Sequence, residues 1–134
     1  MCNICLLIVL GAVFSALVQA PSKTIVSRNA NGMTVTLTNE SGKLHEGKNS
    51  ICVSFQAIKG VQPVNVRNAA IEFTLRVGRN SRVATAPLIQ DADHYCGVID
   101  LGRQFYSSAN YDAVVRYVDS FGKKRKISFG LSLR

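Results

Sequence analysis

The amino-acid sequence predicts an all-β protein, an immunoglobulin-like Greek-key sandwich of about seven strands, preceded by an N-terminal signal segment. Two observations predict the sandwich. From residue 33 onward, apolar and polar residues alternate with a period of two, which indicates half-buried strands. Short groups of Gly, Asn, Asp and Pro separate these segments, and nothing after residue 32 has the pattern of a long helix. A third observation, an uncharged apolar N-terminus, predicts the signal segment.

The alternating segments predict the individual strands and the residues of the core. Phe73 lies in the middle of the longest apolar face, so it is expected to be a central core residue. The weakest segment contains Pro87, which cannot donate a backbone hydrogen bond, and this predicts an edge strand. The expected strands cover residues 33–38, 51–55, 69–77, 83–88, 95–101, 111–117 and 127–133.

The N-terminal segment has the pattern of a secretory signal. Residues 4–18 form an almost wholly apolar run of about 15 residues, whereas a membrane-spanning helix needs roughly 20. Val18 and Ala20 stand where small residues precede a cleavage site, although Pro21 would follow it. The predicted organisation is therefore a signal peptide or short uncleaved anchor (1–20), a polar lead-in (21–31) and the sandwich (32–134). The protein is expected in the periplasm or outside the cell.

The charge of the chain is concentrated after the signal segment. The formal net charge is +8, and residues 1–22 contain no Asp, Glu, Lys or Arg. Such a balance favours acidic partners. Export argues against nucleic acid, which leaves an anionic envelope component or another envelope protein as the expected partner. The alternative is that these charges are only solvated loop residues.

The four cysteines divide into two pairs. Cys2 and Cys5 lie in the signal segment and would leave with it. Cys52 and Cys96 remain, and an even number of cysteines in an exported domain suggests a disulfide. If the two predicted strands are neighbours, both side chains lie on the same outward face. The alternative is a pair of independent thiols.

Residues in both halves of the domain match the pattern of a known family. Gly42, Gly47 and Asn49 connect the first two predicted strands, and Tyr111 stands where that family often has an aromatic residue. In these stretches the chain resembles the YtkA-like and FixH-like exported β-sandwich domains. The resemblance implies the fold and the compartment. It does not imply a copper site, because the Met-Pro-x-Met motif of the copper-linked members is absent and the domain has one Met, Met33.

Residues with catalytic or metal-binding chemistry are few. Asp91, Asp93 and His94 are the weak candidates for a metal site, since carboxylate and imidazole groups lie together in one turn. The sequence contains no G-x-S-x-G elbow, H-E-x-x-H motif or phosphate-binding Gly-rich loop. We therefore expect no catalytic residues, no cofactor and no enzyme activity.

The densest charge in the chain is a run of four cations between two predicted strands. Phe121 and Ile127 flank this run and are expected to anchor the hairpin while its tip stays in water. The run is either a solvated turn or a docking patch for phosphate or carboxylate groups. It consists of Lys123, Lys124, Arg125 and Lys126.

Taken together, these patterns predict a non-catalytic binding or accessory module of the envelope or periplasm. The alternative is a degenerate metal-handling protein related to the copper-associated YtkA-like proteins. The identity of the ligand stays open at this point.

Overall fold

The structure is a computed structural model that describes residues 22–60, 62–77, 80–102 and 110–132. The predicted signal segment lies outside these residues. The described chain is all β, and it contains no helix that is long and apolar enough to cross a membrane. Its strands are β1 (Lys23–Ala30), β2 (Met33–Asn39), β3 (Lys48–Ala57), β4 (Arg67–Val77), β5 (Asn80–Pro87), β6 (Ile89–Asp91), β7 (His94–Asp100), β8 (Asn110–Val118) and β9 (Lys124–Ser132).

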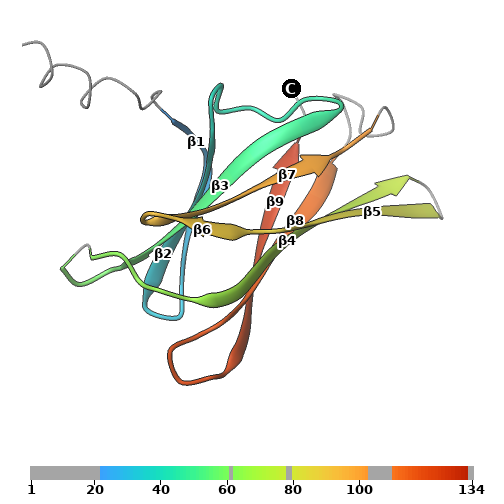
Figure 1. Ribbon diagram of the computed structural model, residues 1–134. Coiled ribbons are helices and arrows are strands. Elements are labelled where there is room, and N and C mark those ends of the chain that lie inside the picture. Colours follow the sequence, from blue (N-terminus) through green and yellow to red (C-terminus); the bar gives the residue numbers. More distant parts are fainter. Residues whose placement is uncertain (1–21, 61, 78–79, 103–109, 133–134) are drawn as a thin grey trace, which may run out of the picture.

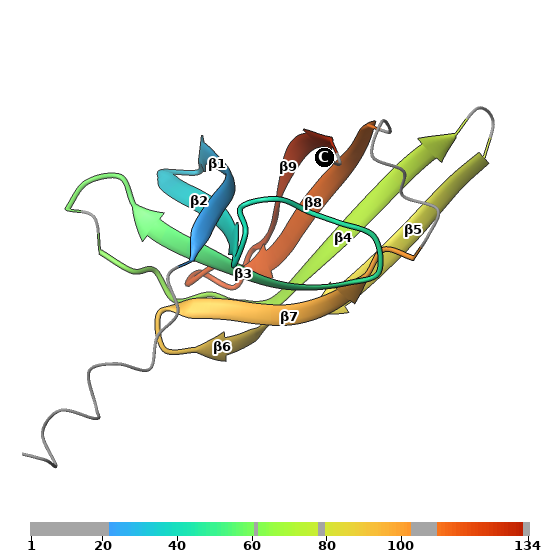
Figure 2. The ribbon, with the colours of Figure 1, turned by 90° about the horizontal axis from the view of Figure 1, so that it is seen from above.

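The strands form two antiparallel sheets that pack face to face. One sheet has the order β1-β2-β3-β7-β6, and the other has the order β5-β4-β8-β9 (Figure 1). Figure 2 shows β9, β8, β4 and β5 side by side in that order. Apart from β1, this is the strand order of an immunoglobulin-like Greek-key sandwich, in which β3 and β7 are neighbours. The predicted fold class is confirmed.

The first strand was not expected, because residues 21–31 look like a polar lead-in. Strand β1 nevertheless pairs with β2 along its length, and Ile25 and Val26 pack against the edge of the core. The guanidinium of Arg28 also donates a hydrogen bond to the carbonyl of Ser128 on β9 in the other sheet. Backbone pairing therefore recruits a segment whose own apolar content is low, and β1 closes one side of the sandwich.

The segment around Pro87 crosses from one sheet to the other. Strand β5 pairs with β4 at the edge of its sheet, as Pro87 predicts. The chain then passes through the buried Leu88, and β6 pairs with β7 in the opposite sheet. The short strand β6 was not predicted, because all its residues are exposed and show no alternation.

The core lies between the sheets and consists of the inward-facing residues that the alternation predicts. Under one end of the sandwich an aromatic group joins three strands: Phe55 contacts Tyr95 edge-on at 5.4 Å and Tyr117 at 5.0 Å between ring centroids. The hydroxyl of Tyr95 accepts a hydrogen bond from the amide of Val66 (2.8 Å) and donates one to its carbonyl (3.1 Å). This pair of bonds fixes the loop between β3 and β4 to the core.

The opposite end is organised by Asn49, the one buried polar side chain among the described residues. Its amide nitrogen donates to the carbonyls of His45 (2.8 Å) and Gly47 (3.0 Å), and its oxygen accepts from the amide of His45 (3.1 Å). The loop that the sequence singled out by Gly42, Gly47 and Asn49 is therefore folded around this side chain. The buried groups are paired, as burial requires.

Gly97 is required where the chain crosses between the sheets. A Cβ atom at this position would overlap the carbonyl oxygen of Pro87. We expect Gly97→Ala to lower the free energy of unfolding by about 1–3 kcal/mol, because the crossover would have to shift. Urea denaturation measures this. Gly130→Ala is the matched control, since its Cβ would meet nothing within 4 Å. Equal effects of the two substitutions would contradict the close approach at Gly97.

Candidate functional site

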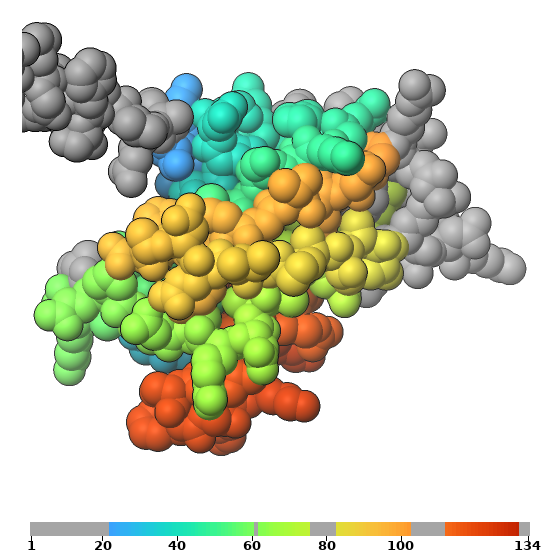
Figure 3. All heavy atoms as spheres, viewed as in Figure 1, coloured from blue at the N-terminus to red at the C-terminus, as the bar shows by residue number. Residues whose placement is uncertain are grey.

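The hairpin of β8 and β9 brings separate cations of the sequence together. In its register Arg116 lies directly opposite Lys126, and Val118 lies opposite Lys124. Tyr117 and Ile127 point into the core, so Arg116, Lys124 and Lys126 point outward, and all three are exposed. Figure 3 shows this part of the chain, in red, protruding at the bottom of the molecule.

These outward-facing side chains border a shallow groove of about 470 Å³. Every charged residue of its lining is basic. Asn68 also lines the groove, from the irregular part of β4 between Arg67 and Ala70, where its φ is +52°. The lining residues are Asn68, Arg116, Tyr117, Val118, Lys124, Arg125 and Lys126. Arg116 does not belong to the basic run that is visible in the sequence, because only the strand register places it there.

Within the part of the chain that the structure describes, the three exposed cations of the groove have no acidic partner. Among the described residues there is one ion pair, which joins Nε of Arg125 to Oδ2 of Asp119 at 3.1 Å. On the neighbouring strand β4, Arg116 lies opposite Ala70. The carboxylate of Glu72 is two residues farther along β4, opposite Val114. Like charges directly opposite each other destabilise an antiparallel pair. The Arg116–Lys126 pair therefore creates a positive potential that a bound anion would relieve.

Asp119 holds the turn between the two strands. Its Oδ1 accepts hydrogen bonds from the amides of Lys123 and Phe121, both at 2.9 Å. The Lys123 bond, followed by the contact with Arg125, lowers the pKa of the Asp119 carboxyl below its ordinary value. These bonds hold the shape of the turn, while the neighbouring cations stay exposed.

The structure divides the predicted basic patch into two parts. Lys123, Lys124 and Lys126 are exposed, whereas Arg125 is half-buried and engaged with Asp119. Of the two predicted anchors, Ile127 is buried, but the prediction for Phe121 was wrong, because this ring is 92% exposed. The turn is closed by Asp119 and by Gly122 at φ +77°, so it needs no apolar anchor at its tip.

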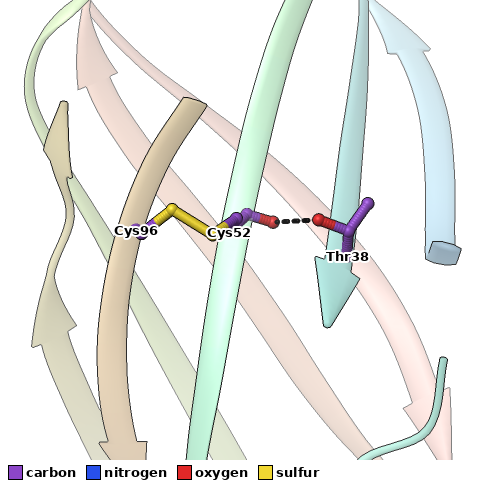
Figure 4. The surroundings of a disulfide bond; sticks show 3 residues. All are labelled: Thr38, Cys52 and Cys96. Atoms are coloured by element: carbon purple, nitrogen blue, oxygen red, sulfur yellow. Dashed lines mark hydrogen bonds between the residues drawn. A yellow bond between two sulfur atoms is a disulfide. The ribbon is translucent and has the colours of Figure 1, made fainter. Parts of the chain in front are cut away.

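The predicted disulfide is present between Cys52 and Cys96, which lie directly opposite each other on β3 and β7 (Figure 4). The sulfur atoms are 2.07 Å apart and the Cα atoms 4.1 Å apart. The hydroxyl of Thr38 on β2 donates to the carbonyl of Cys52 at 3.4 Å. As the alternation predicts, the bridge lies on the outer face of its sheet, where both residues are half-buried.

The weak metal candidates Asp91, Asp93 and His94 lie around the turn between β6 and β7. With the disulfide they line a groove of about 330 Å³. Within the described part of the chain, no three His, Cys, Asp or Glu side chains are grouped so that they could hold a metal ion. The other histidine, His45, lies at the opposite end of the sandwich, where its Nδ1 is 2.9 Å from the carbonyl oxygen of Glu46.

Comparison of the chain with family models, curated proteins and solved structures finds no match. The protein is thus defined by its fold and its surface as a disulfide-containing immunoglobulin-like sandwich that carries a basic groove. The resemblance to YtkA-like and FixH-like domains stays a prediction.

Proposed function

We propose that this protein is a non-catalytic binding module that is exported from the cytoplasm and binds anionic groups in the groove of the β8–β9 hairpin. The observation that carries the proposal is the arrangement of Arg116, Lys124 and Lys126, three exposed cations on one face without an acidic partner in the described structure.

The chemistry of the groove favours phosphate or carboxylate ligands. The guanidinium of Arg116 offers a planar fork of donors that matches either oxyanion, and two ammonium groups add charge beside it. The groove volume of about 470 Å³ lies in the range of small-ligand sites. The same groove could accept charged groups of a polymer, since it is open to solvent.

Two features support a site of action outside the cytoplasm. The apolar, uncharged N-terminal residues have the pattern of a secretory signal. The Cys52–Cys96 disulfide is of a kind that persists in oxidising compartments and is rare in the cytosol. An anionic component of the cell envelope is therefore the ligand class that we propose.

Charge reversal in the groove tests this function. We expect Lys124→Glu/Lys126→Glu to weaken binding of inorganic polyphosphate at least about tenfold, because it replaces attraction by repulsion at two contacts. Isothermal titration calorimetry measures the affinity. The melting temperature should stay nearly unchanged, because exposed charges contribute little to folding. Binding of the unaltered protein should also weaken steeply with salt.

The matched control is Lys43→Glu/Lys48→Glu, in the loop before β3 and at its first residue, which lie at the other end of the sandwich from the hairpin turn. Both lysines are exposed, and this variant lowers the net charge by the same amount. It should retain most of the affinity. If the two double variants lose affinity equally, the protein binds through its net charge alone and the groove is not the site.

A further inference from the structure

Phe121 is the most exposed of the large apolar side chains in the described structure. Its ring is 92% exposed, whereas the next, Ile89, is 71% exposed. It stands at the apex of the β8–β9 hairpin, the segment that projects from the sandwich in Figures 1 and 3. An aromatic ring in water gives up the free energy that its burial would contribute. Phe121 borders a cavity of about 260 Å³ that Met33, Val64 and Tyr117 also line, but at 92% exposure it gains little burial there, which leaves the ring available to an apolar partner outside the domain.

The turn presents this ring on an ordered backbone. The amide of Phe121 donates to Oδ1 of Asp119 at 2.9 Å, and the amide of Gly122 donates to the carbonyl of the same residue at 3.0 Å. The backbone that carries the ring therefore needs little further ordering on contact with a partner, which reduces the entropy cost of binding.

The cations follow the ring in order along the hairpin. Lys123 and Lys124 are exposed next to the apex. Lys126 and Arg116 lie opposite each other about 7 Å farther from it, at the strand rise of about 3.3 Å per residue. The polar layer on each side of a bilayer is roughly 5–8 Å thick. If the Phe121 ring lies at the base of this layer, Lys123 and Lys124 lie among the headgroups. Lys126 and Arg116 then lie within a screening length of the membrane surface.

We propose that the β8–β9 hairpin docks on the anionic surface of a lipid bilayer, with Phe121 inserted into the interfacial region, Lys123 and Lys124 among the headgroups, and Arg116 and Lys126 close enough to be attracted by their charge. This inference rests on the proposed anion-binding function of the groove. Along the hairpin an apolar apex is followed by cations. In an anionic bilayer the apolar region likewise lies beneath negatively charged headgroups, so the two orders match. A soluble polyanion would leave the ring in water, and we therefore favour the bilayer over a free polymer.

A tryptophan reporter tests insertion directly, because the sequence contains no tryptophan. With vesicles of phosphatidylcholine and phosphatidylglycerol at 7:3, ~30% anionic lipid, the emission of Phe121→Trp should shift to the blue. Brominated lipid chains should quench it. Vesicles of phosphatidylcholine alone should produce neither effect. The control reporter is Val83→Trp, at a site 57% exposed on edge strand β5, and its emission should not change.

Partitioning supplies the second readout. In vesicle co-sedimentation, Phe121→Ser should lower the partition coefficient about fivefold, because the ring no longer enters the interface. Val83→Ser should leave it unchanged. Phe121→Ser should also leave polyphosphate binding unchanged, since the groove cations are intact.

The outcomes separate this inference from the proposed function. Binding to polyphosphate and to anionic vesicles, without a tryptophan shift and without an effect of Phe121→Ser, would overturn insertion and leave the anion-binding groove in place. Binding to polyphosphate but not to vesicles would overturn docking on lipid and point to a polymeric or protein ligand. Binding to neither would overturn both proposals.

Discussion

Replacement of Phe73 by alanine is expected to lower the free energy of unfolding by about 3–5 kcal/mol. The ring is completely buried in the middle of β4, which lies between β5 and β8. Its inward-facing neighbours on the same strand, Ile71 and Leu75, are also buried. The surrounding sheets cannot collapse freely onto the space that the ring leaves, so a cavity adds to the lost burial. Urea denaturation followed by circular dichroism measures the change.

Phe121→Ala is the matched control for this substitution. It removes the same atoms from a ring that is 92% exposed, so the free energy of unfolding should change by less than about 0.5 kcal/mol. A small effect at Phe73, or equal effects at both positions, would show that the assignment of inward and outward faces is wrong.

Removal of the disulfide is expected to have the second large effect. Cys52 and Cys96 are separated by 44 positions in the sequence. In the chain-entropy model a bridge over such a loop stabilises the folded state by roughly 3–4 kcal/mol, because it restricts the unfolded chain. We expect Cys52→Ser/Cys96→Ser to lose about this amount, while the sheet pairing of β3 and β7 is retained.

The control for this variant is the neighbouring cross-strand pair on the same outer face, Ser50 and Val98. Ser50→Ala/Val98→Ala alters the surface without changing a covalent link and should cost less than about 1 kcal/mol. Intact-mass analysis after thiol alkylation accompanies the measurement. Two alkylated thiols in natively exported, unreduced protein would contradict the bridge, and so would an unchanged stability of the double serine variant.

The sequence predicted the strands whose burial follows the alternation, and it missed those that form for other reasons. Strand β3 was predicted because its inner face is consistently apolar, and Cys52 followed as an outer-face residue. Strand β1 contains few apolar residues and exists because β2 offers a free edge. Strand β6 is a short exposed piece that pairs only after the chain has crossed beside Gly97. Such effects depend on neighbours that are distant in the sequence.

The candidate site was predicted in part. The run from Lys123 to Lys126 is visible in the sequence, but its division into exposed lysines and a paired Arg125 depends on the position of Asp119. Arg116 could have been found by folding the hairpin about Phe121, which brings it opposite Lys126. The exposure of Phe121 could not, because an apolar residue beside a turn has no alternating partners that show which side it faces.

The most direct test of a functional β8–β9 hairpin is a titration of the ¹⁵N-labelled domain with inorganic polyphosphate, followed by amide chemical shifts. If the groove binds anions, the shifts will be saturable and concentrated at Arg116 and along residues 123–126, with little change around Lys43 and Lys48. Shifts spread evenly over all the basic residues, or absent from the hairpin, would contradict binding in the groove.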